Sequence, residues 1–87
     1  MGVLLPKNVL DDEIKSFYRL VGLNVKKLRE AKGMSQLELA LSLGHASASF
    51  LGKAEIGLED KHFNLEQVYK IAKILDVKIS MLTESQE

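Results

Sequence analysis

Residues 35–57 read SQLELALSLGHASASFLGKAEIG, and they decide the fold of this 87-residue chain. Ser35 stands three residues before Glu38, which is the spacing of a capping box, so a helix is predicted to begin here and to end at Gly44. After a short turn, residues 47–55 predict a second short helix. Two short helices joined by a turn that contains glycine are typical of a helix-turn-helix.

The segment before this stretch predicts one longer helix. Asp11 or Asp12 is expected to cap its start, and Gly33 is expected to end it. Gly22 falls in its middle and predicts either a kink or a close contact with another helix. The apolar stripe that predicts this helix consists of Ile14, Phe17, Val21, Val25 and Leu28.

The segment after the stretch predicts a fourth helix and a last helical turn. Asn64 and Gln67 form a second capping-box pattern, and residues 80–84 form the last turn. Proline occurs only at Pro6, and the chain shows no repeat. The sequence therefore predicts an all-α bundle of four to five short helices with a central helix-turn-helix.

Charge limits the classes of partner. Twelve basic and twelve acidic side chains cancel, which argues against a protein that coats nucleic acid or an acidic membrane by bulk charge. Residues 1–33 nevertheless hold seven basic and four acidic side chains, a local net charge of +3. The sequence therefore leaves room for a local basic surface on a neutral body.

Other chemistry is excluded by composition and spacing. The chain has no Cys, so disulfides, thiolate zinc sites and a Cys nucleophile are ruled out. His45 and His62 do not have the spacing of metal ligands, and no catalytic constellation is present. We therefore expect no enzyme, no cofactor and no metal. Without a membrane-length apolar run or a signal peptide, we expect a cytoplasmic location with no membrane partner.

Three ordered blocks of the sequence resemble a known family. Residues 28–40 (LREAKGMSQLELA), residues 49–57 (SFLGKAEIG) and residues 64–77 (NLEQVYKIAKILDV) are similar to the signature of the phage-repressor and Cro-like (XRE-type) helix-turn-helix family. The resemblance covers roughly residues 20–83. It implies a lambda-repressor-like bundle whose third helix enters the major groove of DNA.

The resemblance also implies roles for individual residues outside that third helix. Arg29 and Glu55 occupy the positions of an inter-helix structural ion pair. Gln36, in the first turn of the second helix, takes the position of a residue that holds a DNA phosphate, and a helix N-terminus suits an anion. Lys61 lies in the loop that approaches the DNA backbone. All four roles are expectations carried over from the family.

The third helix departs from the family pattern. The resemblance places Ser47, Ala48, Ser49, Gly52 and Lys53 on or near its DNA-facing surface, but no Arg, Asn or Gln is available there for a bidentate base contact. The turn is one residue longer than usual, so either Phe50 or Leu51 occupies the core position. We favour Leu51, because it aligns with the family when counted back from Gly57.

The remaining expectations concern domains and assembly. We expect residues 1–16 to be an N-terminal arm or an extension of the first helix, residues 17–84 to be the DNA-binding domain, and residues 85–87 to be a tail. Val3-Leu4-Leu5 fits no helix pattern. Dimerisation is expected to use Ile79, Met81 and Leu82 with part of the fourth helix.

The resemblance implies a sequence-specific transcriptional regulator, of repressor or controller type, that binds a palindromic operator in double-stranded DNA as a homodimer. The alternative is a protein-interaction module or antitoxin of the same fold that reads DNA weakly. The neutral net charge favours this alternative, in which the partner is another protein. So does the third helix, which offers no Arg, Asn or Gln for a bidentate base contact.

Overall fold

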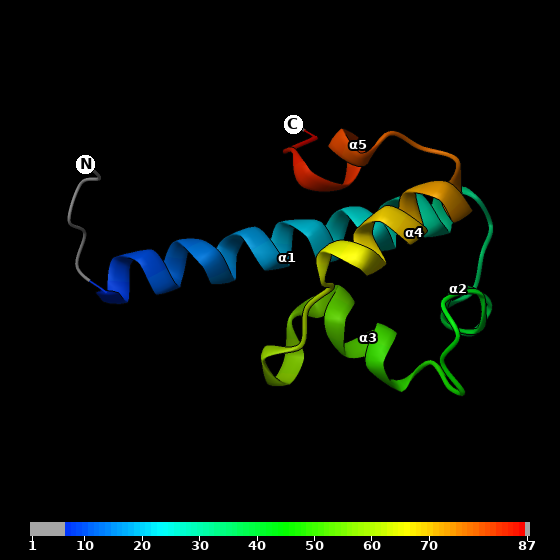
Figure 1. Cartoon of the computed structure of the whole chain (residues 1–87), viewed down its shortest axis with the longest axis horizontal. Coiled ribbons are helices and arrows are strands. Elements are labelled where there is room, and N and C mark those ends of the chain that lie inside the picture. Colours follow the sequence, from blue (N-terminus) through cyan, green and yellow to red (C-terminus); the bar gives the residue numbers. More distant parts are fainter. Residues whose placement is uncertain (1–6, 87) are drawn as a thin grey trace.

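A long first helix organises the molecule. The computed structural model describes residues 7–86, in which α1 (Lys7–Ala31) is followed by α2 (Gln36–Ser42), α3 (Ser49–Ile56), the 3-10 turn η1 (Leu58–Asp60), α4 (Leu65–Leu75) and α5 (Ile79–Thr83). In Figure 1, α3 lies on one side of α1 and α5 on the other, while α4 crosses α1. The described residues contain no strand, and the predicted all-α bundle is confirmed.

The start of α1 corrects one expectation. The helix begins at Lys7, so Asp11 and Asp12 lie inside it and neither caps it. Asp is preferred as a cap but does not by itself start a helix. Because no residue between Pro6 and Asp11 breaks a helix, the helix continues back to Lys7. Residues 7–16 thus continue α1, while Val3-Leu4-Leu5 lies outside the described residues.

The two predicted capping boxes are confirmed. The Ser35 hydroxyl accepts from the Glu38 amide at 3.0 Å, and the Glu38 carboxylate accepts from the Ser35 amide at 2.9 Å. Asn64 and Gln67 make the same reciprocal pair at 2.8 and 2.9 Å. Two hydrogen bonds with Ser35 lower the pKa of Glu38, and the bond from the Ser35 backbone has the larger effect. Each box therefore fixes the residue at which its helix begins.

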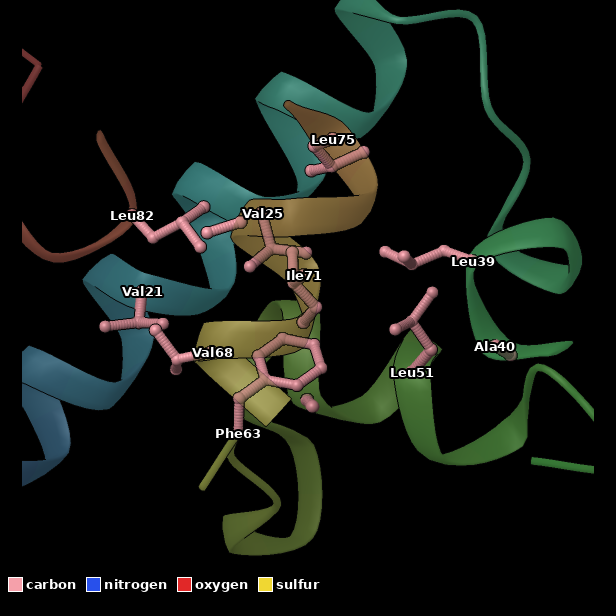
Figure 2. Close-up of a cluster of buried hydrophobic side chains, with 12 residues drawn as sticks. Val21, Val25, Leu39, Ala40, Leu51, Phe63, Val68, Ile71, Leu75 and Leu82 are labelled. Atoms are coloured by element: carbon pink, nitrogen blue, oxygen red, sulfur yellow. The ribbon is translucent and has the colours of Figure 1, made fainter. Parts of the chain in front are cut away.

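The core joins every helix. Val21 and Val25 from α1 meet Phe63, Ile71 and other apolar side chains of the later elements (Figure 2). The full set of buried apolar residues is Val21, Val25, Leu39, Ala40, Leu51, Ala54, Phe63, Val68, Ile71, Ala72, Leu75 and Leu82. Burial of apolar area across all five helices is the main force that holds so short a chain together.

Leu82 corrects the expected dimer surface. Its side chain is 0% exposed, because it fills the core beside α1. The buried Asn24 amide donates to the carbonyls of Leu82 at 3.0 Å and Glu84 at 2.9 Å, which fixes α5 on α1. The expectation that Leu82 joins Ile79 and Met81 in an intersubunit contact is therefore wrong for Leu82.

Gly22 allows α3 to pack closely against α1. A Cβ atom at this position would collide with the backbone carbonyl oxygens of Ala54 and Glu55. The prediction of a close helix contact is thus confirmed, and only the absence of a side chain permits it.

Candidate nucleic-acid interface

A buried polar network sets the angle between the two helices of the motif. Arg29 of α1 pairs with Glu55 of α3 through two hydrogen bonds, Nε to Oε2 at 2.7 Å and Nη2 to Oε1 at 3.0 Å. Arg29 also donates from Nη1 to the Met34 carbonyl at 2.8 Å. Gln36 of α2 donates from Nε2 to Glu55 Oε1 at 3.0 Å. One carboxylate therefore connects α1, α2 and α3.

Burial makes this network a structural element. The side chain of Glu55 is 0% exposed and that of Arg29 is 7% exposed. The hydrogen bond to Glu55 raises the pKa of Arg29 above its already high ordinary value, so the guanidinium stays charged. Since both charges are desolvated, each depends on the other. The network holds α2 and α3 in one relative orientation.

The turn between α2 and α3 explains where α3 begins. Gly44 has a φ of +88°, a left-handed value that suits glycine. The Ser47 hydroxyl accepts from the Ser49 amide at 3.3 Å, so Ser47 lies in the turn and α3 starts at Ser49, two residues later than expected. The preference for Leu51 as the core residue is confirmed, since Leu51 is 1% exposed and Phe50 is only half-buried.

A hollow of about 280 Å³ opens at the N-terminal half of α3. It brings together four of the expected DNA-facing residues, Ser47, Ser49, Lys53 and Lys61. The other residues that line it are His45, Ala46 and Phe50. The hollow thus presents two hydroxyls, two ammonium groups and an imidazole on one exposed surface.

The other two expected residues lie outside this hollow. Ala48 is the half-buried N-cap residue of α3, and no side-chain hydrogen bond caps the helix there. Gln36 lies in the first turn of α2, where its amide faces Gly52 and Glu55. The structure therefore places Gln36 beside α3 but ties one of its amide hydrogens to the buried network.

Two side-chain contacts on this surface were not predicted from the sequence. His45 stacks on Phe50 with ring centroids 5.3 Å apart, which holds the imidazole at the edge of the hollow. The Lys53 ammonium pairs with the Glu59 carboxylate at 2.6 Å. Hydrogen bonding and the charge of Lys53 lower the pKa of Glu59, so this acidic group stays ionised at neutral pH.

The Lys53–Glu59 pair has an unusual backbone origin. Glu59 and Asp60 have φ values of +55° and +57°, which non-glycine residues adopt infrequently. These two residues fold η1 back toward α3, so a carboxylate meets the surface that Lys53 and Lys61 would otherwise make basic. The resulting surface is polar and mixed in charge.

Within residues 7–86, no helix is both long and apolar enough to cross a bilayer. The same residues contain no group of three His, Asp or Glu side chains placed to hold a metal ion.

Comparison with protein families identifies a match that covers the helix-turn-helix. The family model described as helix-turn-helix matches residues 25–82, two thirds of the chain, and this span contains the whole α2–α3 motif and the Arg29–Glu55 pair. The search of curated proteins and the search of solved structures each returned no match. The matched family is one of DNA-binding domains and not of enzymes. The chain therefore belongs to the phage-repressor and Cro-like (XRE-type) helix-turn-helix family of DNA-binding regulators.

Proposed function

We propose that this protein is a cytoplasmic, sequence-specific transcriptional regulator that binds a palindromic operator as a homodimer and acts as a repressor or controller. In this proposal residues 17–84 form the DNA-binding domain, and α3 of each subunit enters the major groove. Two half-sites then lie about 34 Å apart on one face of the duplex.

The observation that carries the proposal is the exposed surface of α3. The buried network fixes α3 against α1 and α2, while Ser47, Ser49 and Lys53 remain exposed or half-exposed beside Lys61. Hydroxyls accept and donate hydrogen bonds to base edges, Lys53 matches guanine acceptors or a phosphate, and the Ala48 methyl suits a thymine methyl. A rigid support under an exposed polar helix face is what groove reading requires.

Gln36 and Lys61 are assigned to the DNA backbone. The Gln36 amide carries two hydrogens, and one is donated to Glu55 Oε1. The second is available to a phosphate oxygen at the N-terminus of α2. Lys61 is exposed and lines the hollow at the N-terminal half of α3, whereas Gln36 faces Gly52 and Glu55 in the second half of that helix. Contacts of this kind position a protein on the duplex without reading sequence.

Replacing Lys53 with alanine is expected to weaken operator binding and leave stability nearly unchanged. The side chain is 36% exposed, and its ion pair with Glu59 is a surface pair worth little to folding. Titration of operator DNA against wild type and Lys53→Ala measures the effect, with Lys70→Ala as the control because Lys70 forms an exposed ion pair on α4. Equal losses for Lys53→Ala and Lys70→Ala would contradict the assignment.

Replacing Glu59 with glutamine is expected to act in the opposite direction. The change removes one negative charge beside the DNA and releases Lys53 from its carboxylate partner. Tighter binding to both operator and random DNA is the expected result, because the added attraction is directed at phosphates. Glu66→Gln on α4 removes the carboxylate of another exposed pair and serves as the matched control.

A second candidate function is supported by the same ion pair. A surface whose lysine is already neutralised by Glu59 also suits a protein-interaction module or antitoxin of this fold. A salt titration separates the two functions. The affinity of binding through phosphates falls by orders of magnitude between about 50 and 200 mM salt when many contacts are made, whereas the affinity of a protein interface with an apolar core changes far less.

A wild-type protein that binds operator and random DNA with equal affinity would refute sequence-specific binding.

A further inference from the structure

Another cavity lies between α1 and η1. It has a volume of about 230 Å³, and its walls come from residues 11–19 of α1 and from residues 57–62. In Figure 1 the segment that follows α3 lies below α1, on the same side as α3. We call this cavity the η1 pocket. Of the residues assigned above to DNA, Lys61 lines the η1 pocket, and it also lines the hollow beside α3.

The η1 pocket has an aromatic wall. The rings of Tyr18 and His62 stack face to face, with centroids 3.7 Å apart and planes inclined by 6°. The His62 Nδ1 donates to the Asp60 carbonyl at 3.1 Å, so the ring pair is fixed to η1 as well as to α1. Ile14 adds an aliphatic side chain to the lining. Walls of this kind suit a planar apolar group.

The charged part of the lining favours an anion. Three cationic side chains and two carboxylates surround the pocket: Lys15, Arg19 and Lys61, with Asp11 and Asp60. Within residues 7–86, Arg19 forms no ion pair, and Lys15 lies 4.0 Å from Asp60, at the outer limit of one. A guanidinium whose donors are free binds a carboxylate through two parallel hydrogen bonds.

Arg19 is held in position by its packing on the end of α3. A Cβ atom added at Gly57 would lie 3.1 Å from Arg19 Cγ and 3.4 Å from Arg19 Nε, so the Arg19 side chain passes directly over Gly57. Gly57 is the C-cap residue of α3. The cation therefore stands ready at the pocket, and a ligand that binds it pays little to order it.

We propose that the η1 pocket binds a small aromatic carboxylate and that the bound ligand releases Lys53 from Glu59. The ring of the ligand packs against Ile14 and the aromatic wall, and its carboxylate binds Arg19. The pocket is smaller than the roughly 300–1,000 Å³ of sites for drug-sized molecules, which suits a ligand with one ring. The lining has one cation in excess, so it suits a monoanion better than a doubly charged phosphate.

The connection to Lys53 runs through η1, and this step rests on the proposed function. Asp60 lines the pocket, while its neighbour Glu59 pairs with Lys53 on the DNA-facing surface at 2.6 Å. Both η1 residues have positive φ values, which persist only where the surroundings hold them. A ligand carboxylate beside Lys15 competes with Asp60 and removes one such contact. The ligand thereby favours a conformation in which Glu59 leaves Lys53, and Lys53 becomes available to DNA.

Titration of the isotope-labelled full chain with sodium benzoate, followed by NMR, tests the site. Benzoate is expected to shift the amide signals of residues 11–19 and 57–62. Arg19→Ala is expected to weaken benzoate binding at least about tenfold, because a charged hydrogen-bond donor is lost. Lys27→Ala is the control, since Lys27 is an exposed cation of α1 outside the pocket. Benzyl alcohol lacks the charge and acetate lacks the ring, so both are expected to bind more weakly than benzoate.

Titration of duplex DNA of random sequence, with and without benzoate, tests the connection to Lys53. Saturating benzoate is expected to tighten DNA binding by wild type about fivefold, at the lower end of the usual coupling between two sites. Glu59→Gln is expected to lose this response, because Lys53 has already lost its carboxylate partner. Glu66→Gln is the matched control and is expected to respond as wild type does.

Four results would overturn the proposal: no binding of benzoate, binding that Arg19→Ala leaves intact, inorganic phosphate that binds the same residues as tightly as benzoate, or a wild-type DNA affinity that benzoate does not change. The phosphate result would assign the pocket to the DNA backbone instead. A chain that binds benzoate through Arg19 but binds no DNA under any condition would refute the proposed function, and the ligand site would stand, because the NMR titration needs no DNA.

Discussion

Replacing Arg29 with alanine is expected to lower the free energy of unfolding by about 3–5 kcal/mol, since removing one partner of a buried ion pair leaves the other charge uncompensated. In this variant the Glu55 carboxylate, which is 0% exposed, keeps only the Gln36 amide as a side-chain donor. Each kcal/mol moves the melting midpoint of so small a domain by at least about 4 °C. Thermal unfolding followed by circular dichroism measures the loss.

Two further variants make this prediction specific to the pair. Lys70→Ala removes an exposed ion pair with Glu66 and is expected to cost far less than Arg29→Ala, because solvent screens such surface pairs. The double variant Arg29→Met with Glu55→Leu is expected to recover much of the loss, because no unpaired charge remains buried. A melting curve for Arg29→Ala that matches wild type would show that the pair does not hold α1 to α3.

Replacing Gly22 with alanine is expected to destabilise the protein by about 3 kcal/mol, the upper part of the usual range for overpacking a core. The new Cβ would meet the carbonyl oxygens of Ala54 and Glu55, which are backbone atoms and cannot turn aside. Helix α3 must then move away from α1, so operator binding is expected to fall together with stability. Chemical denaturation measures the free energy, and DNA titration measures the second effect.

Gly52 supplies the matched control for this change. It also lies within a helix, but the nearest atom to an added Cβ is the Gln36 side-chain oxygen at 3.4 Å, an ordinary contact. Alanine favours a helix interior over glycine by up to about 1 kcal/mol at either position. Gly52→Ala is therefore expected to be neutral or stabilising. If Gly22→Ala were equally stabilising, the close packing of α3 against α1 at Gly22 would be refuted.

The features that were predictable from sequence depend on residues close together in the chain. Both capping boxes involve side chains three residues apart, and the glycine at position 44 takes the positive φ that a tight turn needs. The Arg29–Glu55 pair was expected only through a family resemblance, since nothing local relates residues on two different helices. Ser47, Ser49, Lys53 and Lys61 were named on the same basis, and the structure brings these four to one hollow.

The features that escaped prediction depend on distant or rare geometry. Leu82 was assigned to a dimer surface, but it is buried in the core, and the Asn24 side chain 58 residues earlier donates to its backbone carbonyl. The Lys53–Glu59 pair depends on two successive left-handed residues, Glu59 and Asp60, for which no glycine or asparagine gave a signal. The cap of α1 was expected at Asp11 or Asp12 because these residues resemble a cap, and a helix that extends before them was only one of two alternatives.

The hydrogen bonds of Asn24 have a consequence for the order in which this chain folds during synthesis. Asn24 is made early, but its amide is satisfied by the carbonyls of Leu82 and Glu84, which are made late. Until those residues leave the ribosome, a polar group on the core face of α1 lacks its partners, and the space that Leu82 fills is open. The nascent helices can form one by one, but the domain completes its core only after residue 84 has been released.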